Sequence, residues 1–346
     1  RSRAMASRHQ KDAVVRSPEM PRRAFLATIA GGLLAAPFAS EAQEAGKVYR
    51  VGFLGNSTAA LEANLVGSFR EGLRDLGYVE GRNVVIEYRW AEGKYERFPA
   101  LVAELLALKV DVIVTAGTPA AVAVKQATTT VPLVMAAVGD PVGTGLIASL
   151  ARPGGNLTGL AAISPDLEGK RFELLRELLP KLSLVSFMVN PANPLHSVSE
   201  KHAREAAKVL RLRLEFVGVR TEAEFDHAFE TIVRERPGAM VVLADRVFLH
   251  NRERIVAFAA RHRLPTVYPY RELVDAGGLM CFGPNYPELH RRAAIFVDKI
   301  LKGASPANLP VEQPTNFELV INVRTATALG LTIPPSLLAR ADQVVE

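Results

Sequence analysis

The feature of this sequence that most constrains its fold is a regular alternation of strand-like and helix-like segments. Runs rich in Val, Ile and Leu mark the strands of a first series, at residues 48–54, 84–90, 110–115 and 132–138. Amphipathic segments with apolar residues at helical spacing lie between them. Strands joined by helices in this way run parallel, with helices on both faces of the sheet. A second series of similar size has its strands at residues 184–189, 212–219, 239–243 and 266–268.

The two series follow each other without a long linker. The sequence therefore predicts an α/β fold with two doubly wound parallel-sheet lobes packed around a cleft. We expect the chain to cross between the lobes around residues 157–162, 278–283 and 314–321. The first lobe is then expected to comprise residues 43–158 plus 285–312, and the second lobe residues 159–284 plus 313–346.

The best-defined candidate site is at residues 110–120, which read V-D-V-I-V-T-A-G-T-P-A. The apolar run has the composition of a buried parallel strand. Thr118 is a good N-cap, and Pro119 suits the first turn of the helix that follows. Free N–H groups at such a helix start, together with Gly117 and the Thr118 hydroxyl, predict a site for an anion such as a carboxylate.

Polar residues also follow the other strands, at the edge where open α/β sheets bind their ligands. Each of them alone is typical of an ordinary turn. Together their hydroxyls, amides, carboxylates and aromatic rings suit a small zwitterion with an apolar side chain. The candidate ligand-binding residues are Asn56, Ser57, Gly117, Thr118, Pro119, Asp140, Asn190, Asn193, Asp245, Tyr268 and Asn285.

An amino-acid ligand would need partners for both of its charges. Its carboxylate is expected at the helix opened by Thr118, where the helix dipole favours an anion. Its ammonium group needs an acceptor that stays ionised at neutral pH, and Asp140 and Asp245 are the candidates. Asp140 is favoured for holding the ligand in the open form, because it belongs to the same lobe as Thr118. Asp245, across the cleft, would then act in closure.

The positive charge of the chain is concentrated at its start. Residues 1–42 contain seven Lys or Arg and three acidic residues, so they hold +4 of the net +6. The remaining chain is nearly neutral and shows no basic stripe with interleaved aromatic residues. We therefore expect no nucleic-acid partner.

The same 42 residues have the features of an export signal. Arg22-Arg23 is a twin-arginine pattern, and an apolar run too short to span a bilayer follows to Phe38. Small residues place the cleavage site near Ala42-Gln43. Met20 is the expected translation start. These features predict an exported, periplasmic protein without a lipid anchor.

Motifs for catalysis are weak. Cys281 is the single cysteine, so it forms no intrachain disulfide, and its apolar surroundings predict a buried thiol. The segment from Gly143 to Ala148 matches G-x-G-x-x-A, but it follows the fourth strand instead of the first. The seven histidines form no metal-binding motif. We expect no enzyme activity and no cofactor. One alternative is an enzyme with its active site in the cleft, where Asp140 or Asp245 acts as the base.

Several longer motifs together resemble a known family, the ABC-transporter substrate-binding proteins, in the tryptophan/tyrosine-type branch. The resemblance covers about residues 47–345 and rests on V-G-F-L-G-N-S, E-G-L-R-D-L-G-Y-V-E-G-R-N-V, T-A-G-T-P-A-A, G-D-P-V-G-T-G-L, A-R-P-G-G-N-L-T-G, N-P-A-N-P and G-L-T-I-P-P-S-L-L. It implies a type I periplasmic binding fold with three crossings, no catalysis, and a ligand site at residues 117–119, at 139–140 and at the strand ends of the second lobe.

The resemblance also implies that the partner is an ABC permease in the inner membrane, which the protein contacts transiently. The protein itself is expected to be a monomer. The ligand is expected to be a small molecule of the amino-acid class, because members with known ligands bind aromatic amino acids. A sensor subunit that docks on a membrane receptor is the alternative. This sequence departs from the family pattern at Arg246, in A-D-R-V-F. If Arg246 faces the cleft, a simple aromatic ligand is disfavoured.

Overall fold

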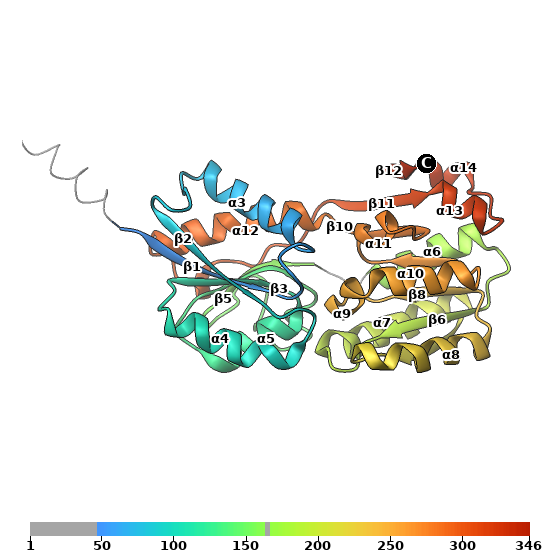
Figure 1. Cartoon of the computed structure of the whole chain (residues 1–346), viewed down its shortest axis with the longest axis horizontal. Helices are drawn as coiled ribbons and strands as arrows, with labels where there is room; N and C mark the ends of the chain where they lie inside the picture. The colour runs from blue at the N-terminus through green and yellow to red at the C-terminus, as the bar shows by residue number, and fades with distance from the viewer. Residues whose placement is uncertain (1–46, 163–166) are drawn as a thin grey trace, which may run out of the picture. The chain divides into compact units, whose positions relative to one another are not determined.

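The computed structural model describes residues 47–162 and 167–346, and residues Val48–Glu346 form one compact unit. Within these residues the strands form two separate sheets, each covered by helices (Figure 1). The prediction of two α/β lobes is thus confirmed. The export signal predicted for residues 1–42 lies outside the described residues.

The first sheet has the order β2-β1-β3-β4-β5, and all of its pairs are parallel. Its strands are β1 (Tyr49–Gly55), β2 (Val84–Trp90), β3 (Val112–Ala116), β4 (Leu133–Val138) and β5 (Leu157–Ala161). The central strands β3 and β4 are buried at every position. Because helices cover both faces, these strands are apolar apart from Thr115.

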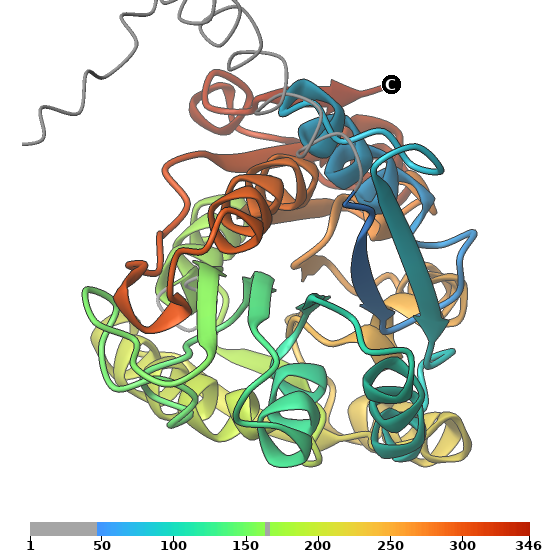
Figure 2. The same ribbon diagram turned by 90° about the vertical axis from the view of Figure 1, so that its left-hand side faces the viewer.

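The helices of the first lobe lie on both faces of its sheet (Figure 2). They are α3 (Ala63–Asp75), α4 (Phe98–Ala107), α5 (Thr118–Ala127) and α12 (Tyr286–Leu301), with short 3₁₀ turns η1 (Tyr95–Arg97) and η4 (Pro306–Asn308). Helix α12 packs closely on α3, although more than 200 residues separate them. A Cβ atom at Gly72 would lie 2.9 Å from the Cβ of Ala294, so glycine permits this approach.

The second sheet has the order β12-β11-β10-β9-β8-β6-β7. Its strands are β6 (Leu184–Val189), β7 (Arg213–Gly218), β8 (Ala239–Val242), β9 (Thr266–Tyr268), β10 (Met280–Pro284), β11 (Phe317–Asn322) and β12 (Gln343–Val345). Its helices are α6 (Glu168–Leu178), α7 (Pro194–Leu210), α8 (Phe225–Glu235), α9 (Arg246–His250), α10 (Arg252–Arg261), α11 (Arg271–Asp275), α13 (Val323–Ala328) and α14 (Pro335–Leu338), with the 3₁₀ turn η3 (Glu222–Glu224).

One strand pair of the second sheet departs from the parallel arrangement. Strands β10 and β11 are antiparallel, with Cys281 opposite Val320. The reason lies in the connections, since the chain leaves β10 for α12 in the first lobe and re-enters the second sheet as β11 from the opposite end.

The chain passes between the lobes after β5, between β10 and α12, and before β11. The predicted boundary at residue 158 falls inside β5, which pairs with β4 as far as Ala161. Near the second passage, the buried side chain of Arg171 donates to the carbonyl of Phe282 at 2.9 Å and to buried Glu168 at 2.6 Å. Burial raises the pKa of Glu168 to about 7, against the effect of Arg171.

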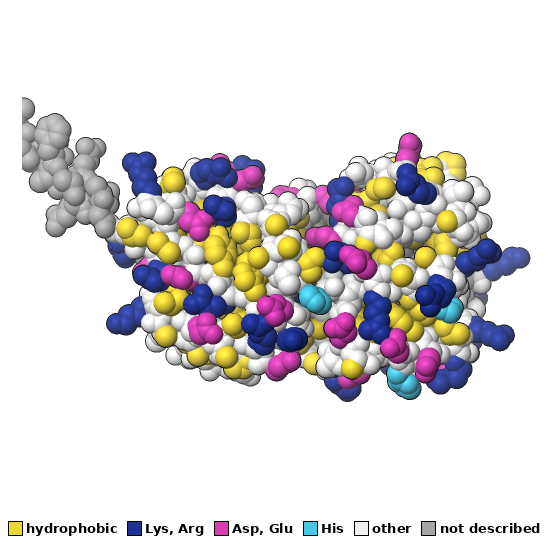
Figure 3. Space-filling model, in the orientation of Figure 1, with side chains coloured by type: hydrophobic (Ala, Val, Ile, Leu, Met, Phe, Trp, Pro, Cys, Tyr) yellow, Lys and Arg dark blue, Asp and Glu magenta, His cyan; other side chains and the backbone are white. Residues whose placement is uncertain are grey.

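The described surface carries charges of both signs, and the single thiol is buried. Lys and Arg side chains are interspersed with Asp and Glu over the face shown in Figure 3. No helix in the described part of the chain is long and apolar enough to cross a membrane. Cys281 is buried as predicted, and burial raises the pKa of its thiol to about 12.

Candidate ligand-binding cleft

A pocket lies where the carboxyl ends of strands from both sheets meet. Its lining comes from both lobes and consists of Tyr95, Gly117, Thr118, Pro119, Ala137, Gly139, Ala162, Asn193, Leu195, Ala244, Asp245, Arg246, Tyr270 and Tyr286. The open volume is about 20 Å³, which is room for about one water molecule. The lobes must therefore part to admit a ligand of amino-acid size.

Two larger depressions lie elsewhere on the protein. One of about 400 Å³ lies beside α3 and β2, around Arg70 and Tyr78, and belongs to the first lobe alone. The other, of about 450 Å³, lies near the passage from β10 to α12, around Glu272 and Asn285. We favour the smaller pocket because it lies at the strand ends and contains buried polar groups that converge from two lobes.

The first-lobe wall of the pocket is the start of helix α5. Gly117 is the N-cap, with φ +79°, and Thr118 is the first helical residue, so the helix begins one residue earlier than predicted. The positive φ explains why glycine occupies position 117. The Gly117 N–H donates to the carbonyl of Ala137 at 2.7 Å. Thr118 is 1% exposed, and its hydroxyl has no hydrogen-bond partner among the described residues.

Glu62 supports this wall from behind. Its Oε1 atom accepts the N–H groups of Asn56 at 2.8 Å and Ser57 at 2.6 Å. The Asn56 amide in turn donates to the carbonyl of Ala116 at 2.7 Å, which fixes the loop after β1 to the end of β3. Burial raises the pKa of Glu62, while the charge of Arg246 in the other lobe and the two N–H bonds act to lower it.

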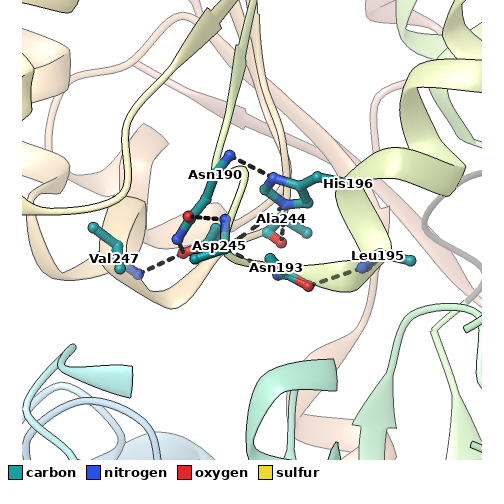
Figure 4. A network of polar contacts seen from close by, with 8 residues as sticks. Asn190, Asn193, Leu195, His196, Ala244, Asp245 and Val247 are labelled. Atoms are coloured by element: carbon teal, nitrogen blue, oxygen red, sulfur yellow. Dashed lines mark hydrogen bonds and ion pairs between the residues drawn. The ribbon is translucent and has the colours of Figure 1, made fainter. Parts of the chain in front are cut away.

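The second-lobe wall is a hydrogen-bonded network around Asp245 (Figure 4). Oδ1 of Asp245 accepts the N–H of Val247 at 2.9 Å, which caps helix α9, and the amide of Asn190 at 3.2 Å. Oδ2 accepts the amide of Asn193 at 2.9 Å. Asn193 also caps helix α7, since its Oδ1 accepts the N–H of Leu195 at 3.0 Å. The network therefore fixes the starts of two helices against each other.

His196 completes the network as a neutral ring. Its Nδ1 accepts the N–H of Asn190 at 2.6 Å, and its Nε2 lies 3.2 Å from the carbonyl of Ala244. These partners assign the tautomer with the proton on Nε2. Burial lowers the pKa of His196, with the charge of Asp245 acting against that shift. His196 therefore has a positioning role in this wall.

Arg246 lies beside this network and is only 5% exposed. Its guanidinium carbon lies 5.1 Å from the ring centroid of Tyr270 and 5.7 Å from that of Tyr286. Both distances are within the range of cation–π contacts. Its charge also acts on Glu62 of the first lobe, so the two side chains are electrostatic partners across the cleft. A buried cation thus faces the pocket.

The two walls touch each other across the cleft. The hydroxyl of Ser57 lies 3.2 Å from Nδ1 of His250 in the second lobe. Burial raises the pKa of Tyr95, and the nearby charge of Asp245 in the other lobe raises it further. A Cβ atom on Gly139 would lie 2.9 Å from Cγ of Leu195, so the backbone of one lobe is in close contact with a side chain of the other. These contacts define a closed cleft.

The predicted site residues divide into three groups. Gly117, Thr118, Pro119, Asn193 and Asp245 line the pocket. Asn56, Ser57 and Asn190 lie directly behind the lining, bonded to residues that support it. The structure places the remaining three predicted residues away from the lining, and each of them has a structural role there.

Asp140 closes a local turn, because its Oδ1 accepts the N–H groups of Val142 at 3.1 Å and Gly143 at 2.7 Å. Tyr268 is the last residue of β9 and is fully buried in the core. Asn285 caps helix α12 by accepting the N–H of Glu288 at 2.7 Å, and it faces the depression near β10. The prediction that Asp140 holds the ligand's ammonium group therefore has no support from these contacts.

Several residues of the cleft lie outside the set of candidate ligand-binding residues. They are Glu62, Tyr95, Leu195, Arg246, Tyr270 and Tyr286, together with His196 and His250. The sequence did point to Arg246 and Tyr270, since both follow the ends of predicted strands. Glu62 and Tyr95 lie within or next to helical segments, where a sequence pattern gives no sign of a site. Among the described residues, no group of three or more His, Cys, Asp or Glu side chains could hold a metal ion.

A two-lobed α/β protein with a closed cleft of this kind belongs to the class of solute-binding proteins, which bind small molecules between their lobes. Sugar-binding and leucine-binding proteins of Geobacillus stearothermophilus and Thermotoga maritima, at 11% and 14% identity with TM-scores of 0.58 and 0.52, share this type I fold alone. The family model for ABC transporter substrate binding proteins matches residues 57–345, and the chain belongs to that family. It is a binding protein and not an enzyme.

Similar proteins have been described from three bacteria. A tyrosine-binding protein of Clostridioides difficile is 28% identical over 264 residues, which cover 76% of this chain and 75% of that protein. The solved structure of an ABC domain from Streptococcus pneumoniae in complex with L-Trp is 26% identical, with a TM-score of 0.81. That of a conserved domain protein from Vibrio cholerae is 28% identical, with a TM-score of 0.82. Each alignment with these two structures covers 86% of this chain and all of the other.

Proposed function

We propose that this substrate-binding protein is exported, holds a small carboxylate-bearing molecule of the amino-acid class in its cleft, and delivers it to an ABC permease in the inner membrane. The observation that carries the proposal is the start of helix α5. There the buried Thr118 hydroxyl, which has no partner among the described residues, lines the pocket together with Gly117 and Pro119 at the start of a ten-residue helix. Such a helix start binds anions.

The rest of the lining suits an apolar or aromatic side chain. Ala137, Ala162 and Leu195 contribute apolar surface, and Tyr270 and Tyr286 contribute rings whose centroids lie 5.0 Å apart. The ligands named for the relatives, tyrosine and tryptophan, support an aromatic ligand of similar size, whereas the presence of Arg246 in the lining disfavours a simple aromatic ligand, as the sequence predicted for this case. Asp245 is the acidic residue of the lining and the candidate partner for an ammonium group.

A thermal-shift screen tests the ligand class. The compounds are the L-amino acids, their 2-oxo and 2-hydroxy acids, nucleosides and small organic acids. A ligand at about 100 times its dissociation constant should stabilise the protein by about 2.7 kcal/mol, which is easily detected. If only nucleosides shift the melting temperature, the carboxylate proposal is wrong.

Substitutions at two threonines, one in the lining and one outside it, test where the carboxylate of the ligand binds. Thr118→Val removes a hydroxyl without a protein partner, so we expect unchanged stability of the ligand-free protein. Binding should weaken by about 1.5–3 kcal/mol, or about 10- to 150-fold, since the lost bond is to a charged group. Thr115→Val instead removes a buried bond to the carbonyl of Leu54, 2.6 Å long, outside the lining. It should lower stability and leave affinity unchanged.

The export route is proposed from the sequence of the first 42 residues. A precursor with both Arg22→Lys and Arg23→Lys should stay in the cytoplasm, because twin-arginine export depends on that pair. Fractionation of cells that express the two precursors gives the result. Mature protein in the periplasm at the normal level would argue for the general secretory route.

A further inference from the structure

One acceptor in the wall of the first lobe is left without a donor. It is Oδ1 of Asn56, in the loop after β1, and the residue is only 1% exposed. No described residue donates a hydrogen bond to this oxygen. The orientation of the amide is fixed, because its Nδ2 donates to the carbonyl of Ala116 at 2.7 Å and the opposite orientation would place two oxygens against each other. Since an unpaired buried acceptor costs free energy, this oxygen is suited to accept a hydrogen bond from a ligand.

The backbone of Asn56 holds this oxygen in place. The N–H of Asn56 donates to Oε1 of Glu62 at 2.8 Å, and its carbonyl accepts the N–H of Gly93 at 2.8 Å. Together with the bond from Nδ2 to Ala116, these bonds give the residue three fixed partners. The side chain therefore cannot turn toward another donor, and the acceptor is preorganised for a ligand.

The unpaired oxygen lies next to the pocket. A Cβ atom on Gly117, which lines the pocket, would lie 3.4 Å from Oδ1 of Asn56. Because position 117 is glycine, this residue has no side chain that covers the oxygen. The next residue is Thr118, whose hydroxyl also has no partner among the described residues. An unpaired acceptor and an unpaired hydroxyl thus lie beside consecutive residues at the start of α5.

The second lobe covers the loop of Asn56 only while the cleft is closed. The hydroxyl of Ser57, the next residue, lies 3.2 Å from Nδ1 of His250. A Cβ atom on Gly93, which bonds to Asn56, would lie 3.3 Å from Cγ of His250. When the lobes part, His250 moves away with its lobe, and the loop is uncovered for a ligand.

We infer that Oδ1 of Asn56 accepts the ammonium group of an α-amino acid whose carboxylate binds at Thr118. The inference rests on the proposed function, since it assigns a further group of the same ligand. An α-amino acid has both charged groups on one carbon, so it needs an acceptor close to the carboxylate site. The first lobe alone then holds both groups in the open form, the task that the sequence predicted for Asp140. Asp245 of the second lobe can reach the ligand only when the cleft closes.

Calorimetry with pairs of compounds that differ only in the ammonium group tests the inference. The pairs are L-tyrosine with 3-(4-hydroxyphenyl)propionate, L-tryptophan with 3-(indol-3-yl)propionate, and L-leucine with 4-methylpentanoate. We expect the amino acid of a pair to bind about 10- to 150-fold more tightly than its desamino counterpart, because it adds a hydrogen bond from a charged group. This ratio is the preference that the variants should change.

Two substitutions of Asn56 separate the acceptor from the rest of the side chain. Asn56→Leu and Asn56→Asp both lose the donor to Ala116, so both should lower the melting temperature. Only the aspartate keeps an acceptor at the position of Oδ1. The preference should fall to about one in Asn56→Leu and persist in Asn56→Asp. A folded Asn56→Leu protein that keeps the full preference would show that another residue binds the ammonium group, and the inference would be wrong.

Gly117→Ala tests the same oxygen without changing Asn56. Its methyl group would lie 3.4 Å from Oδ1 and cover it on the side of Gly117. The matched control is Gly145→Ala, because Gly145 has a similar φ of +71° but no atom within 4 Å of an added Cβ, and it lies outside the lining. The preference should be lost in Gly117→Ala and kept in the control. Equal weakening of both compounds of a pair by Gly117→Ala would contradict the inference.

The compound pairs on the unmodified protein separate the two proposals. Desamino acids that bind as tightly as the amino acids would overturn the inference and leave the proposed carboxylate site standing. If no compound of any pair binds at millimolar concentration, the proposed ligand class fails, and the inference that rests on it fails as well.

Discussion

The two walls of the cleft are built differently. The first-lobe wall presents the start of α5, where the hydroxyl of Thr118 has no partner among the described residues. The second-lobe wall is a network in which Asp245, Asn190, Asn193 and His196 satisfy one another. The first wall is therefore ready to accept a ligand, while the second wall is already complete. This difference indicates that the network's task is to position groups such as Arg246, and that the first wall binds ligand in the open form.

The strongest test of this contrast is Asp245→Ala. It leaves the amides of Asn190 and Asn193 and the N–H of Val247 without their acceptor in a buried site. The free energy of unfolding of the ligand-free protein should fall by about 3–5 kcal/mol, as measured by urea denaturation. Thr118→Val on the opposite wall should leave it unchanged. If Asp245→Ala abolishes binding at full stability, Asp245 contacts the ligand directly and the contrast is wrong.

Gly139→Ala tests the contact between the walls. The new methyl group would overlap Leu195 only when the lobes are closed. Overpacking of this kind costs about 1–3 kcal/mol, so affinity should fall by about 5- to 150-fold in calorimetry. The double variant with Leu195→Ala should recover affinity, because it creates the missing space. An affinity that stays at the original value in the single variant would mean that these residues separate when ligand is bound.

A smaller effect is expected from Ser57→Ala, which removes the bond to His250 across the cleft. One neutral hydrogen bond contributes about 0.5–1.5 kcal/mol, so affinity should fall about 2- to 10-fold. Ser68→Ala is the control, since Ser68 bonds only within α3, to the carbonyl of Asn64. Equal affinities of the two variants would remove the Ser57–His250 bond from the closure mechanism.

The smallest effect is expected from Asp140→Asn. Asparagine can still accept the N–H groups of Val142 and Gly143 and so keep the turn. We expect a change in affinity of no more than about twofold, and a change in the free energy of unfolding within about 0.5 kcal/mol. A loss of 30-fold or more would restore the role that the sequence predicted for Asp140.

The fold was predictable because its signals are local. The apolar run of β3 and the glycine and proline at the start of α5 are contiguous in the sequence and give the same element in the structure. The antiparallel pairing of β10 with β11 was not predictable from such patterns, because it depends on the path of the chain through the first lobe.

The site was predictable only in part, because strand ends that look alike differ in their distant partners. Asp140 and Asp245 both follow a buried strand. Asp140 finds its donors two and three residues away, whereas Asp245 finds two of its donors more than 50 residues away. Similarly, Tyr268 ends β9 inside the core, while Tyr270 lies beyond the strand and reaches the pocket. The spacing of residues in the sequence does not show which distant partners a side chain will contact in the fold.

The central claim is that ligand binds between the lobes, and a reversible cross-link tests it most directly. Gly139→Cys combined with Leu195→Cys places two thiols across the closed cleft, where a Cβ atom at position 139 would lie 2.9 Å from Cγ of Leu195. Buried Cys281 should not interfere. The probe is the compound with the largest thermal shift in the screen. Protein oxidised before the probe is added should not bind it, and protein oxidised afterwards should retain it through dialysis until reduced. Equal binding by the oxidised and reduced ligand-free forms would contradict the account.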